Sequence, residues 1–275
     1  MSDTSLHVRF PSASFLSFAE FEEHLRDVQA RLDARYLYER GLASEDATIE
    51  REGTCAPCLR RARFTSRTGG GEALADGRKV PNWREEMACD CNDRLSGRNR
   101  ALLHFLEAVA GLRSWSRVLL FGPASAADRR IAAAASGVRR IARLGLERAA
   151  AGGPRHRADA ADAAFHLVVS SDYLQRVPPL EVALAEIRRV LVPGGRFVFT
   201  VPFRYRASHT LTRVDTLRRI AGRLPAEANG EVHELGWDLL ERLREAGFID
   251  ARAHTYWSDE LGYLGSFNML FSAVA

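Results

Sequence analysis

The sequence predicts an α/β protein: a mostly parallel, doubly wound sheet that ends in an antiparallel hairpin, with a small cysteine-rich module in front of it. Two observations carry this prediction. From about residue 99 onward, short apolar runs alternate with segments whose apolar residues recur at steps of three and four. Before that point, all four cysteines gather in one stretch that has little apolar periodicity. Strands that alternate with helices imply right-handed crossovers and parallel pairing.

The length and composition fit one α/β domain with a smaller module. Of the 275 residues, 46% are hydrophobic and 27% are charged, which is typical of globular proteins and argues against a disordered or fibrous chain. We expect a helix and cysteine module over residues 1–98 and the larger domain over residues 99–275. No apolar run reaches the ~18 residues of a membrane span, and the first residues lack the order of a signal peptide. These features predict a cytoplasmic protein with no membrane partner.

The positive charge does not predict a nucleic-acid partner. The net charge is +4, and Lys79 is the only lysine, so the excess rests on arginines that are spread along the chain. Electrostatic recognition of nucleic acid needs clustered charge and interleaved aromatic residues. A GC-rich genome produces the same arginine and alanine excess without any functional meaning.

The first segment predicts a long helix, and the stretch after it needs a metal or disulfide cross-link for stability. Apolar residues at helical spacing form one stripe: Phe18, Phe21, Leu25, Val28, Leu32 and Tyr36. Residues 45–100 are polar and rich in Gly, Arg and Cys, and such a segment cannot build a core of its own.

The elements after residue 99 follow in regular order. Predicted helices cover residues 99–111, an Ala-rich segment ending near Gly137, residues 180–191 and residues 236–246. Predicted strands cover residues 118–121, 138–142, 165–169, 196–201, 249–257 and 267–274. About nine turn-rich residues separate the last two strands, which we expect to form the hairpin.

The four cysteines predict a structural zinc site. Cys55 and Cys58 form one closely spaced pair, and Cys89 and Cys91 form another. Two such pairs joined by a loop can close a tetrahedral shell of four sulfurs, which leaves no open position for catalysis. Disulfides or free thiols are the alternative, although disulfides fit a reducing compartment poorly. An iron–sulfur cluster also takes four thiolates, but no other feature here calls for electron transfer.

Three segments carry a resemblance to a known family. They are residues 165–172, residues 184–202 with Pro193-Gly194-Gly195, and residues 233–248, which end in Ala-Gly-Phe. They resemble class I S-adenosylmethionine-dependent methyltransferases of the large type 11 group. The resemblance implies a Rossmann-like, seven-stranded sheet and S-adenosylmethionine as cofactor. Residues 83–87, the cysteine pairs and residues 95–101 are similar to a subgroup that has a four-cysteine zinc module before this domain.

The resemblance also implies where the cofactor binds. The loop after the first strand of the sheet contributes Gly122, Pro123, Ala124 and Ser125. Asp159 or Asp162 falls where an acid would meet the adenine, although either could be a solvated loop carboxylate. Ser170, Ser171 and Asp172 end a strand at its carboxyl edge, where open α/β sheets bind ligands.

Two departures from the family pattern leave an alternative open. The loop after the first strand has one glycine and no acid, and no acid follows the second strand until Glu147. The leading hypothesis is methyl transfer to a small-molecule acceptor, a sugar or a biosynthetic intermediate. The alternative is a non-catalytic scaffold that keeps the fold and binds a protein partner through the cysteine module.

Two residues after the fifth strand are candidates for catalysis. Tyr205 and His209 lie on the side where the acceptor should enter. An imidazole can take a proton from a hydroxyl or amine near neutral pH, so we expect His209 to act as general base. An exposed loop histidine is the alternative interpretation.

Overall fold

The chain divides into two compact units in a computed structural model, which describes residues 8–91, 93–141, 145–148, 154–177, 179–213 and 232–275. The first unit comprises Met1–Ala13, Phe21–Gly111 and Thr255–Asn268. The second comprises Ser14–Glu20, Leu112–His254 and Met269–Ala275. Among the described residues, no helix is long and apolar enough to cross a membrane.

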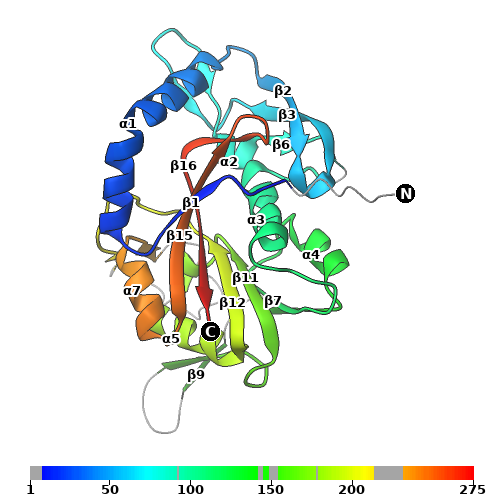
Figure 1. Ribbon diagram of the computed structural model, residues 1–275, viewed down its shortest axis with the longest axis vertical. Helices are drawn as coiled ribbons and strands as arrows, with labels where there is room; N and C mark the ends of the chain where they lie inside the picture. The colour runs from blue at the N-terminus through cyan, green and yellow to red at the C-terminus, as the bar shows by residue number, and fades with distance from the viewer. Residues whose placement is uncertain (1–7, 92, 142–144, 149–153, 178, 214–231) are drawn as a thin grey trace. The chain divides into compact units, whose positions relative to one another are not determined.

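Four parallel strands form the centre of the second unit. They are β7 (Arg117–Phe121), β8 (Gly137–Ile141), β11 (Phe165–Ser171) and β12 (Leu191–Thr200). β11 pairs in parallel with both β7 and β12, and β7 pairs in parallel with β8 (Figure 1). The apolar runs of β7 and β11 are buried almost throughout, as expected for parallel strands covered on both faces. The mixed α/β sheet with a mostly parallel core is therefore confirmed.

The complete sheet has the strand order β1-β15-β16-β12-β11-β7-β8. The added strands are β1 (Ser12–Phe15), β15 (Ile249–Ser258) and β16 (Tyr263–Val274), and β16 is antiparallel to β12. Two details differ from the sequence prediction. β16 begins at Tyr263, so the connection is shorter than the predicted nine residues, because Tyr263 and Leu264 are buried strand residues. β1 was not predicted, since four residues carry too little alternation to mark a strand.

Helices α4 (Asp128–Ala134), α5 (Leu180–Val190) and α7 (Asp238–Glu245) follow the predicted positions. α5 buries the predicted apolar face, from Leu180 to Val190. Gly247 follows α7 with φ +89°, a conformation that favours glycine at a helix end. Smaller elements are the antiparallel pair β9 (Gly145–Arg148) and β10 (Pro154–Arg157), the pair β13 (Leu211–Thr212) and β14 (His233–Glu234), and the 3₁₀ turn η2 (Leu174–Arg176).

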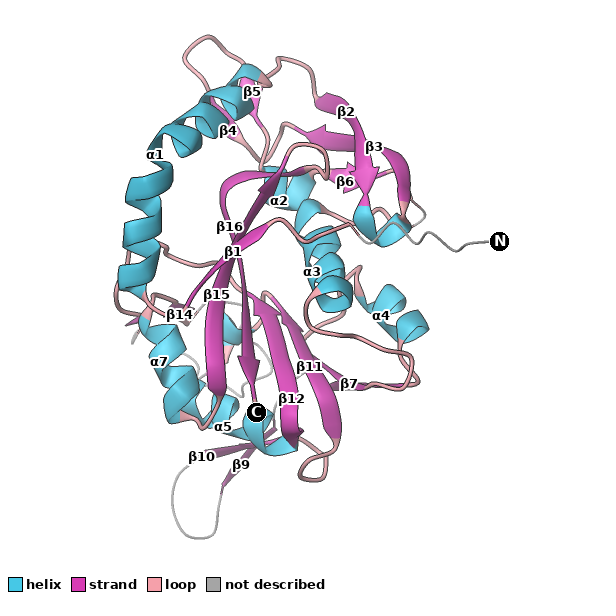
Figure 2. Ribbon diagram, viewed as in Figure 1, coloured by secondary structure: helices cyan, strands magenta, loops and turns pink. Residues whose placement is uncertain are grey.

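The first unit contains the predicted long helix and more strand structure than expected. Its helices are α1 (Phe18–Gly41), α2 (Trp83–Glu86) and α3 (Gly97–Ala108), with the 3₁₀ turn η1 (Ala56–Cys58). Its strands are β2 (Thr48–Cys55), β3 (Arg60–Arg67), β4 (Glu72–Ala73), β5 (Lys79–Val80) and β6 (Ala88–Cys89). β2, β3 and β6 form one antiparallel sheet (Figure 2).

Strands β2 and β3 were not predicted, because residues 45–100 show little periodic apolar signal. These two strands pair along their whole length. The buried positions of β3 do alternate, but Ala62 and Ser66 stand on either side of Phe64 at those positions, with the exposed Arg63 and the half-buried Thr65 between them. Because its buried residues include small and polar ones, β3 lacks the apolar alternation that predicts a strand.

Candidate functional site

Two short turns build the cysteine cluster of the first unit. Cys55 ends β2 and Cys58 ends the η1 turn that follows it. Leu59 then takes φ +52°, and its N–H donates to the carbonyl three residues earlier at 3.1 Å, which turns the chain back into β3. Cys89 ends β6, and Cys91 follows two residues later. β6 pairs with β3, so the sheet brings the second pair to the first.

The thiols lie close enough to share one ion. The sulfurs of Cys55, Cys58 and Cys89 all lie within 4.8 Å of one another, and the Cys91 side chain forms a hydrogen bond with Cys89. None of the four forms a disulfide, and all but Cys58 are buried. Sulfurs around a tetrahedral zinc ion stand about 3.8 Å apart, because each lies about 2.3 Å from the metal. These three sulfurs could hold a zinc ion after a small contraction, whereas the Cys91 sulfur lies outside this group of three.

Hydrogen bonds between the thiols concentrate negative charge on one of them. The pKa of Cys89 is lowered, first because of its hydrogen bond with Cys55. The same hydrogen bond and burial raise the pKa of Cys55. The positive charge of Arg100 also lowers the pKa of Cys89. A buried site that holds anionic sulfur beside a cation suits metal ligation.

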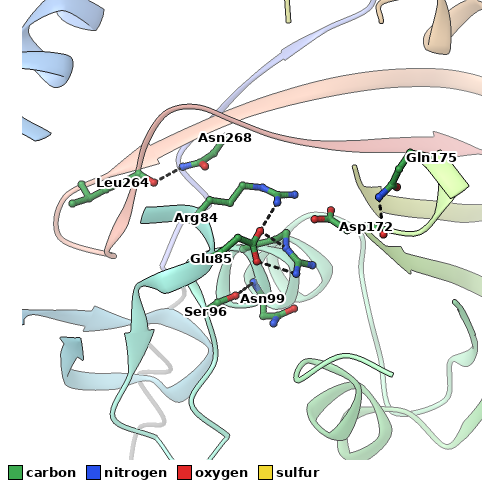
Figure 3. A network of polar contacts seen from close by, with 9 residues as sticks. Arg84, Glu85, Ser96, Asn99, Asp172, Gln175, Leu264 and Asn268 are labelled. Carbon is green, nitrogen blue, oxygen red and sulfur yellow. Dashed lines mark hydrogen bonds and ion pairs between the residues drawn. The ribbon is translucent and has the colours of Figure 1, made fainter. Parts of the chain in front are cut away.

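Residues on both sides of the Cys89 and Cys91 pair form polar contacts, most of them around one carboxylate (Figure 3). Glu85 accepts two hydrogen bonds from Arg98, from Nε at 2.8 Å and from Nη2 at 3.1 Å, and it also pairs with Arg84. Ser96 caps α3 by accepting from the Asn99 N–H at 3.4 Å. The buried Asn99 Oδ1 has no hydrogen-bond partner. The sequence analysis used these residues only for the resemblance and did not predict the network.

In the second unit, the predicted cofactor loop follows β7. Gly122 has φ +114°, and a Cβ atom there would lie 2.8 Å from the Tyr173 side chain. The Ser125 hydroxyl and N–H both donate to Asp128, at 2.7 and 2.5 Å. Arg140 donates to the Gly122 carbonyl at 3.2 Å. Packing against Tyr173 therefore explains why residue 122 is glycine without any ligand. Asp128 and Arg140 hydrogen-bond the polar groups of Ser125 and Gly122 named above. Pro123 and Ala124 complete it as exposed residues.

The two predicted adenine-contacting acids pair with arginines. Asp159 binds Arg139 at 2.8 Å and is fully exposed. Asp162 pairs with Arg189, which also binds Glu186 of α5. The acid expected after the second strand would follow β8. Residues 142–144 and the Glu147 side chain both lie outside the described part of the chain.

Three buried oxygens at the carboxyl ends of β11 and β12 have no hydrogen-bond partner within the described part of the chain. They are Ser170 Oγ at the end of β11, Thr200 Oγ1 at the end of β12, and Gln175 Oε1 in η2. These side chains are at most 1% exposed. Gln175 is held by a hydrogen bond from its Nε2 to the Asp172 carbonyl at 2.9 Å (Figure 3). Buried polar atoms are nearly always satisfied, so this edge fits a ligand or ordered water.

Among these residues, the sequence analysis predicted Ser170, Ser171 and Asp172 but not Gln175 or Thr200. Asp172 adopts φ +47°, and its N–H donates to the Thr200 carbonyl at 2.9 Å. The position of Thr200 as the last residue of a parallel strand was the signal that could have identified it.

The two catalytic candidates differ in their surroundings. The His209 side chain is exposed. Its backbone packs closely on Gly236, because a Cβ atom at Gly236 would lie 2.6 Å from the His209 carbonyl group. Tyr205 is half-buried, its carbonyl accepts from Trp237 Nε1 at 2.9 Å, and the Arg206 guanidinium stands 5.5 Å from its ring centre.

Comparisons with solved structures give distant similarities. An S-adenosylmethionine-dependent methyltransferase from Mesorhizobium loti is 22% identical, over 62% of this chain and 95% of that chain, with a TM-score of 0.41. A putative methyltransferase from Bacillus halodurans is 15% identical, over 62% of this chain and 96% of that one, with a TM-score of 0.40. A Haloferax volcanii complex of the Trm112 methyltransferase activator with a putative methyltransferase is also similar. The identity is 16%, over 61% of this chain and 85% of that chain, with a TM-score of 0.39.

No curated protein matches the chain, but one family model does. Residues 138–199, from β8 through most of β12, match the family model described as a methyltransferase domain. This stretch includes the Ser170–Asp172 edge of β11. The match lies within the part of the chain for which the sequence predicts a methyltransferase domain, and it supports that prediction over these residues.

Proposed function

We propose that the protein transfers a methyl group from S-adenosylmethionine to a small-molecule acceptor, a sugar or a biosynthetic intermediate. The observation that carries this proposal is the match of residues 138–199 to the methyltransferase domain model. Buried oxygens without partners among the described residues support it at the carboxyl ends of β11 and β12, where the register turns Ser170 and Thr200 to opposite faces of the sheet. Such oxygens accept hydrogen bonds from amino and hydroxyl groups, which this cofactor carries. The cofactor supplies an activated methyl group on a sulfonium, so the protein needs chiefly to bind and align the two reactants.

Two observations support the alternative, a non-catalytic scaffold that binds a protein partner through the cysteine module. The predicted acids Asp159 and Asp162 are engaged by Arg139 and Arg189. Tyr173 also packs against Gly122, where close approach of a ligand to the backbone was expected. The alternative therefore requires that the edge near Ser170 holds only water.

Calorimetric titration with S-adenosylmethionine and S-adenosylhomocysteine separates the two functions. The proposal expects wild-type protein to bind both, and Ser170→Ala and Thr200→Val to weaken binding about fivefold each, the value of one lost hydrogen bond. Neither variant should lower stability, because each removes a buried hydroxyl that has no protein partner.

Ser66→Ala is the matched control, since Ser66 is also fully buried with an unpartnered hydroxyl but belongs to the first unit. It should leave cofactor affinity unchanged. Absence of binding at millimolar cofactor would favour the scaffold. Gly122→Val is not a useful test, because its side chain would collide with Tyr173 whether or not a cofactor binds.

The proposal assigns the zinc ion to Cys55, Cys58, Cys89 and Cys91. The buried thiols and their short separations support it. A zinc ion there would tie the η1 turn to the chain after β6 and would be structural. The functional boundary after residue 98 and the location in the cytoplasm stay predictions.

A further inference from the structure

Helix α1 is fixed near its two ends. Near its start, Phe21 is fully buried and its ring centre lies 6.5 Å from that of Phe267, edge to face. Near its end, Glu39 is 5% exposed and accepts from Trp257 Nε1 and from the Gly265 N–H, both at 2.7 Å. All of these residues belong to the first unit. These contacts hold the two ends of α1 against the residue 255–268 segment.

The middle of the helix borders a cavity instead. The predicted apolar stripe continues through Leu25, Val28 and Leu32, and each of these is only half-buried. They line a cavity of about 470 Å³ whose other walls come from residues 9–13 and 255–257. Cavities of about 300–1,000 Å³ are typical of small-molecule sites. The cavity explains why the stripe is apolar although protein atoms cover it incompletely.

The cavity carries positive charge on one part of its wall. Arg9, Arg31 and Arg35 line it together with His24, and none of its lining residues in the described chain is acidic. Within the described residues, none of these arginines forms an ion pair with a carboxylate. The Arg35 guanidinium lies 4.6 Å from the Trp257 ring centre. Burial, followed by the charge of Arg31, lowers the pKa of Arg35.

Like charges gathered around an apolar space repel one another unless an anion joins them. Arginine offers a planar fork of N–H donors that matches carboxylate and phosphate groups. The remaining wall, with Phe10, Val28 and Trp257, is apolar and aromatic. We propose that this cavity binds an organic anion whose apolar body lies along the α1 stripe and whose carboxylate or phosphate meets Arg31 and Arg35. This site is separate from the proposed methyl-transfer function.

Calorimetry with naphthoate tests the site on the full-length protein, and naphthamide is the uncharged control of the same shape. We expect naphthoate to bind and naphthamide to bind about tenfold more weakly, because a charged hydrogen bond is lost. Arg31→Gln should weaken naphthoate binding by a similar factor. Arg26→Gln, an exposed residue of α1 outside the cavity, should leave it unchanged.

Val28→Phe tests the cavity itself, since the added ring would occupy it. We expect this variant to keep its thermal stability and to lose naphthoate binding. Four results would each overturn the proposal: no naphthoate binding at millimolar concentration, equal affinity for the amide, equal losses in Arg31→Gln and Arg26→Gln, or full affinity in a folded Val28→Phe protein.

Discussion

The guanidinium carbon of Arg100 lies 4.1 Å from the centre of the Phe64 ring, in the interior of the first unit. Arg100 is fully buried and donates to the backbone carbonyls of Leu261 at 2.7 Å, Gly262 at 2.8 Å and Met87 at 3.3 Å. No carboxylate in the described chain pairs with it. An uncompensated buried charge costs several kcal/mol. Four thiolates around a zinc ion carry a net negative charge, which would balance this cation.

Replacement of Arg100 tests that balance. We expect Arg100→Met to lower the free energy of unfolding by about 3 kcal/mol, because three carbonyls lose their donors and the proposed zinc site would lose its counter-charge. Arg100→Lys keeps the charge but not the forked donors, so its loss should be smaller. Urea unfolding and zinc content of the purified variants measure both effects. Full zinc retention and wild-type zinc affinity in Arg100→Met would show that the arginine does not compensate the site.

The state of the four cysteines can be read from their reactivity. If zinc binds them, a thiol reagent should react slowly with native protein and rapidly with all four thiols after a strong chelator is added. Elemental analysis should give about one zinc per chain. Cys55→Ser should lose the metal. Thiols that react only after a reductant would indicate disulfides, and a slow reaction that the chelator does not speed up would indicate buried thiols without metal.

Because His254 is buried, we expect the free energy of unfolding to fall in mild acid. Its side chain is 5% exposed, and Nε2 lies 2.8 Å from Ser272 Oγ. Burial, and then the charge of Arg252, lowers its pKa from 6.5 to about 4. The unfolded chain therefore binds a proton below pH 6.5, whereas the folded protein does not until about pH 4. Stability is complete above pH 6.5, falls between these values, and should be about 2 kcal/mol lower at pH 5.

Urea unfolding at several pH values checks this prediction. His254→Gln removes the titrating group and should flatten the curve by about the same amount. Ser208→Ala, at an exposed position without a titratable group, is the control and should not change the slope. Burial also lowers the pKa of His104 and His233, so part of the acid sensitivity should remain in His254→Gln. An unchanged slope in that variant would contradict the assignment.

The sequence predicted the second unit better than the first for a physical reason. Parallel strands buried on both faces require continuous apolar runs, and those of β7 and β11 stand out in the sequence. β3 buries small and polar side chains such as Ala62 and Ser66, so its alternation carries little apolar signal. The cysteine spacing indicated a cluster, but it contained no information about β2 and β3, which bring the pairs together.

The candidate cofactor edge was only partly predictable. Strand ends located Ser170 to Asp172, because ligands bind at the carboxyl edge of open sheets. Gln175 could not be identified, since its burial depends on the η2 turn and on a hydrogen bond to the Asp172 carbonyl. The pairing of Asp162 with Arg189 likewise depends on how α5 packs and not on spacing.

The exposed position of His209 makes its proposed role as general base open to a clean test. Because the side chain is exposed, His209→Ala should not change thermal stability. If the imidazole takes the acceptor proton, turnover should fall by about 10²-fold while S-adenosylmethionine affinity stays the same, and the rate should lose its dependence on pH near neutrality. Release of S-adenosylhomocysteine with a small-molecule extract as acceptor source provides the assay, and Ser208→Ala is the neighbouring exposed control. Equal losses of affinity and turnover would indicate damage to the binding site, and undiminished turnover would remove His209 from the reaction.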